Sequence, residues 1–352
     1  MQEFTVPPPV ERGDRVAIIA PASNSADEFP HVYELGLERI RERFGLEPVE
    51  YPTATKSAEW LAEHPGARAE DVMDAFRDPE ISAVIANIGG NDQVRILEHL
   101  DPEVLRDNPT RFYGWSDNTH LALTLWNQGI VSYYGGSTLL EYAMDGEMFE
   151  YTVEFLERAL FEDSLGELRE ADEFTDETGD WPDPDSLDVP RETESNPGWT
   201  WAGGESAVSG RVWGGCFEVL VDRFLADVDL PDPDALDGAI LAMETSELIP
   251  HPGEVESYLQ ALGERGLLER FDGVLVGRPA ARSHEEMYDH PADWREQYRE
   301  RQREAIERVV TRYNPGAPIV FDLEFGHTYP TAPIPIGGRV EIDPQHERIA
   351  FG

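Results

Sequence analysis

Residues 112–119 read Phe-Tyr-Gly-Trp-Ser-Asp-Asn-Thr, and the interpretation of the whole chain starts from them. A short apolar run ends at Gly114, Ser116 follows two residues later, and an apolar pattern with helical spacing begins at Asp117. A strand, a tight turn carrying a serine and a helix are the parts of a nucleophile elbow. Asn118 stands where the second glycine of Gly-x-Ser-x-Gly would be. Because Ser and Asp are also common helix N-caps, this stretch alone leaves a capped helix start as the alternative.

The first 165 residues alternate strand and helix signals. Continuous apolar runs at Val16–Ala20 and Ala83–Ile88 indicate buried strands of a parallel sheet. Further strands are expected at 48–51, 112–114 and 131–134, and helices at 33–44, 69–77, 94–100, 117–126 and 148–161. This alternation predicts an α/β domain with helices on both faces of the sheet. Sites on such sheets lie at the carboxyl ends of strands, where Gly89-Gly90-Asn91-Asp92 and Ser116 are both expected.

Residues 166–200 differ in composition from the chain on either side. They are crowded with Asp, Glu, Pro and Thr, hold few aliphatic residues and contain Trp181. Such a composition fits an acidic linker between domains. Tryptophan is an unusual choice for a linker, however, and a long inter-domain loop is often a lid or a binding loop. Both interpretations stay open.

Residues 201–352 are predicted to form a second, smaller α/β domain with a mixed sheet. Glycine-punctuated strands are expected at 207–212, 239–243, 273–276, 319–323 and 337–342, and helices at 217–224, 254–262 and 294–313. The expected organisation is therefore an N-terminal domain (1–165), an acidic inter-domain loop (166–200) and a C-terminal domain (201–352).

The charge balance is strongly acidic, with 71 acidic residues against 28 basic ones and a net charge of −43. Only Lys56 among the basic residues is a lysine, and the acids recur along every expected helix. This pattern is typical of a protein that works in concentrated salt, where screening removes the self-repulsion. It argues against a nucleic-acid partner, because no basic patch is left to neutralise phosphates. An acidic surface that recruits a cationic ligand is the alternative.

Other counts exclude several further classes of protein. The single cysteine, Cys216, excludes an internal disulfide framework and a cysteine-rich metal site. No stretch approaches the roughly 18 consecutive apolar residues of a membrane helix, and the first residues lack the pattern of a secretory signal. We therefore expect a cytoplasmic protein without a membrane partner.

A serine nucleophile needs a base to accept its proton and a carboxylate to orient that base. Among nine histidines, His327 stands out, because it lies in Gly-His-Thr-Tyr-Pro directly after an expected strand. Glu244 ends the apolar strand expected at 239–243, and Glu247 competes with it for the role of carboxylate. None of these residues is decisive alone.

Six motifs together resemble the LD-carboxypeptidase family of serine peptidases, and most closely its microcin-immunity branch. The resemblance covers nearly the whole chain, in order and spacing. The motifs are Ala17-Ile18-Ile19-Ala20-Pro21-Ala22-Ser23, Ile88-Gly89-Gly90-Asn91-Asp92, Gly114-Trp115-Ser116-Asp117-Asn118-Thr119, Gly214-Gly215, Leu241-Ala242-Met243-Glu244 and Gly326-His327-Thr328-Tyr329-Pro330.

The resemblance implies a fold and a set of roles. It implies an amidotransferase-like, flavodoxin-like N-terminal domain that holds the nucleophile, and a C-terminal domain that supplies the other two members of a triad. It assigns Ser116 as nucleophile, Glu244 as orienting carboxylate and His327 as base. The three residues occur along the chain in the order Ser, Glu, His, which is the order expected of a triad whose serine lies in a nucleophile elbow. Backbone N–H groups of Gly90 and Asp117 would stabilise the oxyanion.

The resemblance also bears on the partners of the site. It assigns substrate contacts to Asn91, Asp92 and Trp181. Trp181 would stack on a nucleotide base, with a simple hydrophobic anchor as the alternative role. It implies a homodimer and chemistry that needs no metal or other cofactor. Cys216 stands where the family usually has asparagine, so a supporting hydrogen bond is expected to be missing.

The sequence therefore predicts a serine hydrolase that acts through an acyl-enzyme. The favoured substrate is a peptide–nucleotide conjugate of the microcin type, and the alternative is the L,D-bond of a cell-wall muropeptide. A non-catalytic small-molecule-binding protein on the same scaffold is the alternative from another class.

Overall fold

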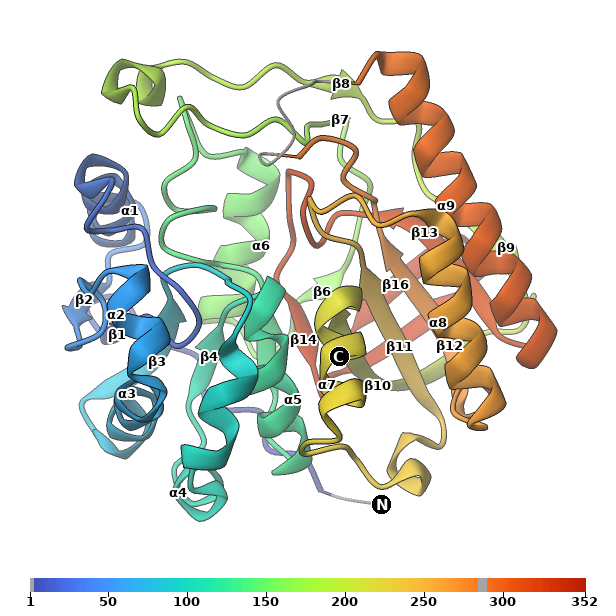
Figure 1. The fold of residues 1–352 in the computed structure, drawn as a ribbon, viewed down its shortest axis with the longest axis horizontal. Helices are drawn as coiled ribbons and strands as arrows, with labels where there is room; N and C mark the ends of the chain where they lie inside the picture. The colour runs from blue at the N-terminus through green and yellow to red at the C-terminus, as the bar shows by residue number, and fades with distance from the viewer. Residues whose placement is uncertain (1–2, 284–289) are drawn as a thin grey trace.

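Two sheets, of six and eight strands, organise residues 3–283 and 290–352, which are the residues that the computed structural model describes (Figure 1). The six-stranded sheet has the order β14-β5-β4-β3-β1-β2. Its members are parallel except β14, which pairs antiparallel with β5. The strands are β1 (Arg15–Ile19), β2 (Glu47–Glu50), β3 (Ile81–Ala86), β4 (Arg111–Tyr113), β5 (Ser132–Tyr134) and β14 (Ile334–Ile336).

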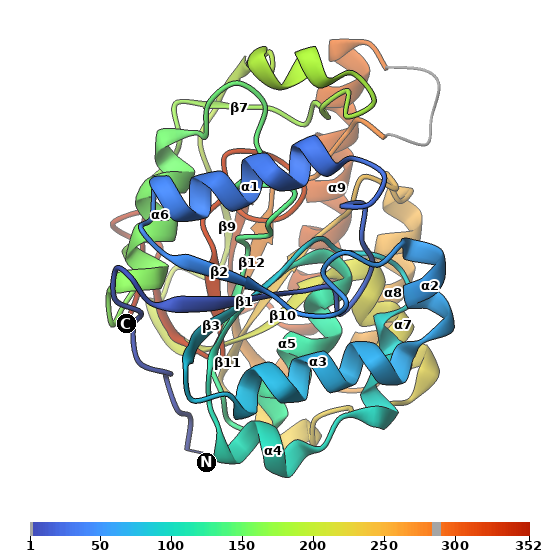
Figure 2. The ribbon, with the colours of Figure 1, turned by 90° about the vertical axis from the view of Figure 1, so that its left-hand side faces the viewer.

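Helices cover both faces of this sheet, because the side chains of β1 alternate between two apolar cores. Val16 and Ile18 pack in one core with Leu37 of α1 (Pro30–Glu42), whereas Ala17 and Ile19 pack in the other with helix α3. Figure 2 shows α1 and α3 on opposite sides of the strands. The remaining helices of this half are α2 (Ala58–Glu63), α3 (Pro65–Arg77), α4 (Pro102–Asp107), α5 (Thr119–Asn127) and α6 (Glu150–Phe161).

The eight-stranded sheet is mixed, with the order β6-β16-β15-β10-β11-β12-β13-β9. Its centre, β10 to β13, is parallel, and the flanking strands pair antiparallel. The strands are β6 (Gly166–Glu167), β9 (Thr200–Gly203), β10 (Val208–Cys216), β11 (Ala239–Glu244), β12 (Phe271–Gly277), β13 (Pro318–Leu323), β15 (Arg339–Asp343) and β16 (Arg348–Phe351). The helices are α7 (Phe217–Ala226), α8 (Pro252–Glu264) and α9 (Ala292–Tyr313).

Residues 166–200 form a long segment, including β7 (Glu173–Phe174) and β8 (Glu194–Ser195), that runs across the top of the molecule in the view of Figure 1. The segment contributes β6 and, through residues 200–203, β9 to the second sheet, and β7 pairs with β8. Between β7 and β8 lies a short 3-10 helix, Pro184–Asp188. Buried Asp176 fixes the segment by accepting hydrogen bonds from Arg299 at 2.5 Å and Arg282 at 3.0 Å.

The segment from Glu324 to Ile336 ties the two sheets together. It leaves the second sheet at the end of β13 and enters the first as β14, where Ile334 pairs with Tyr134. His327 lies within this crossing segment. The site described below therefore depends on both sheets.

The predicted fold class is confirmed, since a parallel-sheet N-terminal part precedes a second, mixed sheet. Two predicted helices differ in detail. The helix expected at 117–126 begins with a 3-10 turn, Ser116–Asn118, before α5, and the one expected at 94–100 is a 3-10 helix, Gln93–His99. The periodic pattern does not distinguish a tight 3-10 turn from an α-helix. Among the described residues, no helix has the length and apolar character needed to cross a membrane.

Candidate active site

Ser116 occupies a strained turn at the carboxyl end of β4. Its φ is +59°, a left-handed conformation that few residues other than glycine adopt. Gly89 makes room for the turn, because a Cβ there would lie 2.7 Å from Cβ of Ser116. A strained serine between a strand and a helix is the geometry of a nucleophile elbow.

Asn118 explains why the elbow needs no second glycine. Its buried amide donates hydrogen bonds to the carbonyl oxygens of Ile88 at 3.0 Å and Trp115 at 3.1 Å. Its Oδ1 accepts a hydrogen bond from Gln93 Nε2 at 2.8 Å. The side chain thus fastens the turn to the end of β3 and the loop that follows.

Hydrogen bonds connect Ser116 to residues from the second sheet. His327 Nε2 lies 3.1 Å from Ser116 Oγ, and His327 Nδ1 lies 2.7 Å from Oε2 of Glu244, the last residue of β11. The Tyr134 hydroxyl donates to Glu244 Oε1 at 2.5 Å and accepts from the Ser116 N–H at 3.1 Å. Glu244 and Tyr134 are almost completely buried. A serine, an imidazole and a carboxylate in this order can pass a proton from the hydroxyl to the ring.

Trp115 sets the position of the imidazole from one side. Its ring meets that of His327 edge to face, with centroids 4.5 Å apart, and its Nε1–H donates to Glu141 Oε2 at 3.2 Å. Glu141 is buried, and burial raises the pKa of its carboxyl group. The hydrogen bond to Glu141 thus fixes the Trp115 ring, and the Trp115 ring packs against the imidazole of His327.

A second carboxylate reaches the same imidazole. Glu247 Oε2 lies 3.0 Å from His327 Nε2, the nitrogen that faces Ser116. Burial lowers the pKa of His327, but the charges of Glu244, Glu247 and Glu218 and the hydrogen bond that the ring donates to Glu244 outweigh it and raise that pKa to about 9. The expected competition between Glu244 and Glu247 therefore has a geometric answer, since each faces a different ring nitrogen.

Of the two residues expected to supply oxyanion donors, Gly90 lies in the loop after β3 and Asp117 directly follows Ser116. Gly90 lines the cavity, and a Cβ there would lie 2.9 Å from Cβ of Ser23. The buried Asp117 side chain accepts hydrogen bonds from the N–H groups of Asp92 at 3.0 Å and Gln93 at 2.8 Å. Burial, with a contribution from the charge of Asp92, raises the pKa of Asp117 to about 7.

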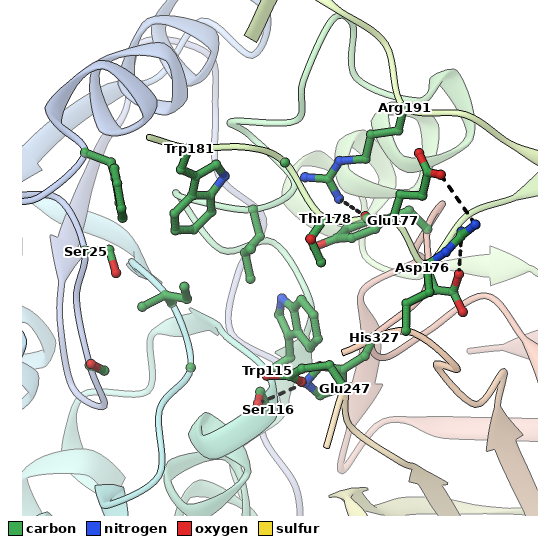
Figure 3. A pocket seen from close by; sticks show the side chains of 18 of the residues that line it. Ser25, Trp115, Ser116, Asp176, Glu177, Thr178, Trp181, Arg191, Glu247 and His327 are labelled. Carbon is green, nitrogen blue, oxygen red and sulfur yellow. Dashed lines mark hydrogen bonds and ion pairs between the residues drawn. The ribbon is translucent and has the colours of Figure 1, made fainter. Parts of the chain in front are cut away.

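A cavity of about 470 Å³ opens above Ser116 (Figure 3). Residues of the first sheet's loops, the acidic segment and the crossing segment line it together. Among the lining residues are Ser23, Phe29, Gly90, Trp115, Ser116, Asp176, Glu177, Trp181, Arg191, Glu247, Arg282, His327 and Tyr329. The acidic segment is thus a wall of the cavity, as expected of a binding loop.

Trp181 closes one end of this cavity. Its ring contacts Phe29 with centroids 5.6 Å apart and an interplanar angle of 64°, and its carbonyl oxygen lies 2.8 Å from His31 Nε2. Asn91 and Asp92, both described, are outside the cavity lining. Asp92 instead accepts hydrogen bonds from Arg68 at 2.8 Å and Arg95 at 3.0 Å, so its charge is used to hold the loop.

Two family models match the chain on either side of the acidic segment. The model of the LD-carboxypeptidase N-terminal domain matches residues 16–135, and that of the LD-carboxypeptidase C-terminal domain matches residues 209–342. The chain belongs to the LD-carboxypeptidase family. The predicted family is therefore confirmed.

Several members of the family resemble the chain over most of its length. A crystal structure of an MccF-like protein from Streptococcus pneumoniae in complex with AMP is 30% identical, with a TM-score of 0.86, covering 97% of this chain and 99% of that one. The probable murein peptide carboxypeptidase of Bacillus subtilis is 26% identical over 96% of this chain and 91% of its own. The microcin C7 self-immunity protein MccF of Escherichia coli is 22% identical over 81% of this chain and 77% of its own.

Sequence reasoning missed several residues of this LD-carboxypeptidase site. Tyr134 ends an expected strand, and a tyrosine there is equally consistent with core packing. Glu218 lies in the first turn of α7 and accepts hydrogen bonds from Ser246 N–H at 3.0 Å and Ser246 Oγ at 2.7 Å. The backbone N–H of Cys216 donates to Thr119 Oγ1 at 3.0 Å, a contact that does not depend on the side chain at this position. These contacts join residues far apart in the sequence, so only the tertiary structure reveals them.

Proposed function

We propose that this member of the LD-carboxypeptidase family hydrolyses an amide bond through Ser116, His327 and Glu244. His327 takes the hydroxyl proton as Ser116 Oγ attacks the carbonyl carbon, and then gives that proton to the leaving nitrogen. Water attacks the resulting acyl-enzyme, passes a proton to His327 and restores the serine. The observation that carries the proposal is the hydrogen-bonded series from Ser116 through His327 to Glu244, with Ser116 in a strained elbow.

The oxyanion of the tetrahedral intermediate needs donors close to Ser116 Oγ. We assign this role to the backbone N–H groups of Gly90 and Asp117. Gly90 lines the cavity, and Asp117 follows the nucleophile at the start of a helical segment, where the peptide dipoles favour negative charge. A tertiary loop held by the Asp117 side chain keeps both groups in place.

The favoured substrate is a conjugate of an amino acid or peptide with a nucleotide. Trp181 and Phe29 form an aromatic end of the cavity, on which a purine ring can stack. The 30% identical relative from Streptococcus pneumoniae was solved with AMP bound, which supports the same ligand class for this chain. Asn91 and Asp92, the other predicted substrate contacts, lie outside the lining and have no part in this proposal.

A muropeptide is the second candidate substrate. Arg191 and Arg282 line the cavity and offer partners for the terminal carboxylate of a peptide. Both arginines also contact acids, Arg191 with Asp145 at 2.8 Å and Arg282 with Asp176 at 3.0 Å. The murein peptide carboxypeptidase of Bacillus subtilis is the relative that supports this alternative.

The two substrates are separated by a direct comparison in molar salt. The enzyme and its Ser116→Ala variant are incubated with alanyl sulfamoyl adenosine and with an L,D-tetrapeptide, and products are followed by mass spectrometry. The proposal expects release of alanine from the nucleoside conjugate by the wild-type enzyme alone. Exclusive release of D-alanine from the tetrapeptide would favour the second candidate, and no release from either would reject both.

Two further expectations remain proposals. We infer a homodimer and a cytoplasmic location, both consistent with a family that acts on small diffusible substrates. Sedimentation in molar salt measures the first, and fractionation of the source cells measures the second.

A further inference from the structure

Glu247 is a carboxylate of the cavity that the proposed proton relay does not use. It lies three residues beyond Glu244, and the two carboxylates face opposite nitrogens of His327. The Glu244 side chain is completely buried, whereas 30% of the Glu247 side chain is exposed and lines the cavity. A substrate in the cavity can therefore contact the partly exposed side chain of Glu247 close to Ser116.

Distances limit what Glu247 can touch. Ser116 Oγ and Glu247 Oε2 lie 3.1 Å and 3.0 Å from the same nitrogen of His327, so the two oxygens are at most about 6 Å apart. In an amino acid, two covalent bonds of about 1.5 Å each separate the carbonyl carbon from the α-nitrogen. An α-nitrogen of the group that Ser116 attacks therefore comes within reach of Glu247.

We propose that Glu247 binds the free α-ammonium group of the amino acid whose carbonyl Ser116 attacks. The site would then take conjugates that carry a single amino acid with an unblocked α-amine, in preference to peptidyl conjugates and muropeptides. In those, the same nitrogen is an amide and carries no charge. This inference rests on the proposed hydrolase function and names the class of substrate within it.

The contact with His327 couples binding to chemistry. The charge of Glu247, whose Oε2 lies 3.0 Å from Nε2, favours the protonated ring, and in that state the nitrogen has no lone pair for the Ser116 proton. A substrate ammonium gives Glu247 another partner and withdraws its charge from the ring. His327 then loses its proton more readily and becomes competent as a base.

Other charged and titratable groups around His327 do not face the cavity in this way. Glu244 approaches from β11 and is held by Tyr134 of β5, while Glu218 approaches from α7 beside Cys216. Glu218 also raises the pKa of His327 but is only partly exposed and lies outside the lining. It therefore provides a control that changes the charge near the ring without touching the substrate.

The test compares alanyl sulfamoyl adenosine with its N-acetyl derivative at pH 7 in molar salt. We expect the wild-type enzyme to have a kcat/KM about 10- to 100-fold higher for the free amine, the range typical of a hydrogen bond between charged groups. Glu247→Gln should bring this ratio close to one. Glu218→Gln should shift the pH profile but keep the ratio. The preference should also fade above about pH 8, where an α-amine loses its proton.

The outcomes test two statements separately: that Glu247 binds the α-ammonium group, and that the protein is a hydrolase. A wild-type ratio near one, or a ratio unchanged by Glu247→Gln, overturns the assignment of Glu247 and leaves the hydrolase intact. Failure of the wild-type enzyme to cleave either compound overturns nucleotide conjugates as its substrates, and failure to cleave an L,D-tetrapeptide as well overturns the proposed hydrolase function itself. Should Glu247→Gln not fold, calorimetry with Ser116→Ala decides: tighter binding of the free amine supports the assignment, and equal binding of both compounds overturns it.

Discussion

Ser116 holds a backbone conformation that costs free energy, and its neighbours explain how the conformation persists. A non-glycine residue at φ +59° is disfavoured by about 1–2 kcal/mol. Its N–H donates to the Tyr134 hydroxyl, and its carbonyl accepts from Thr119 Oγ1 at 2.7 Å. The turn is thereby fixed from β5 and α5 at once, with the hydroxyl aimed at His327.

Removal of the Tyr134 hydroxyl should reveal its double role. Tyr134→Phe leaves Glu244 Oε1 and the Ser116 N–H without this partner, so we expect a loss of about 1–3 kcal/mol in the free energy of unfolding. We also expect kcat to fall by roughly 10- to 100-fold, because a displacement of the reacting groups by about 1 Å can slow a reaction about 100-fold. Denaturant unfolding and steady-state kinetics measure the two effects. Tyr133→Phe on the same strand is the control, and equal losses in both variants would contradict the role of Tyr134.

The proton affinity of His327 predicts the pH dependence of the reaction. Only the neutral ring accepts the Ser116 proton, and with a pKa of about 9 the ring is mostly protonated at neutral pH. kcat/KM should therefore rise about tenfold per pH unit below pH 9 and level off above it. Glu247→Gln removes one of the charges that raise this pKa, so the rise should occur at lower pH. A profile that is flat from pH 6 to 9 with a substrate lacking an amine would contradict this assignment.

Site residues could be predicted from the sequence where they follow strands. Ser116, Glu244 and His327 each come after an apolar run, and the order of motifs supported their selection. Tyr134, Trp115 and Glu218 could not be selected in this way, because a buried aromatic ring or a carboxylate early in a helix has the same local pattern with or without a neighbouring site. Their contacts join residues that are far apart in the sequence, as between Tyr134 and Glu244.

At the scale of elements, the acidic segment is a wall of the cavity that ion pairs hold in place. Asp176 bonds to Arg299 of α9, while Arg191 bonds through Nε to Asp145 at 2.8 Å and through a second nitrogen to the Glu177 carbonyl oxygen at 2.8 Å. Asp176 also accepts from the N–H of Ala281 at 2.8 Å. These contacts connect the segment to both halves of the chain. Residues 166–200 therefore form a fixed loop, although their amino-acid composition is typical of a flexible linker.

Weakening this anchor should loosen the cavity wall more than the fold. Asp176→Asn removes the charge that Arg299 and Arg282 share, so we expect KM to rise by about fivefold or more with a smaller change in kcat. Hydrogen exchange of residues 173–195 should accelerate at the same time. Asp185→Asn, at an exposed position of the same segment, is the matched control. Unchanged exchange in Asp176→Asn would contradict the anchoring role.

Short elements of the fold escaped sequence analysis for a physical reason. β14 is three residues with a central proline, a composition that argues against a strand except at an edge, and β14 is indeed the edge of the first sheet. The long apolar runs that form β1, β3, β11 and β13 were predicted to within about two residues, because burial on both faces leaves a strong signal. Pairing between distant segments leaves no such signal.

At the scale of the whole molecule, the surface charge predicts a requirement for salt. A net charge of −43 creates self-repulsion that a Debye length of about 3 Å at 1 M salt largely screens. We expect the melting temperature to rise by at least about 10 °C between roughly 0.2 M and 2 M KCl. Differential scanning calorimetry measures the shift. A melting temperature that is independent of KCl would contradict the interpretation of the acidic surface.

Ser116, the proposed nucleophile, follows a strand of the first sheet. Glu244, the proposed carboxylate, ends a strand of the second sheet, and His327, the proposed base, lies in the segment that crosses between the two sheets. The most direct test is labelling with a fluorophosphonate in molar salt, followed by peptide mapping with mass spectrometry. We predict a single labelled residue, Ser116, with labelling abolished in Ser116→Ala and strongly slowed in His327→Gln. Labelling of another serine, or equal rates in the wild-type enzyme and His327→Gln, would contradict the assignment of Ser116 as a nucleophile activated by His327.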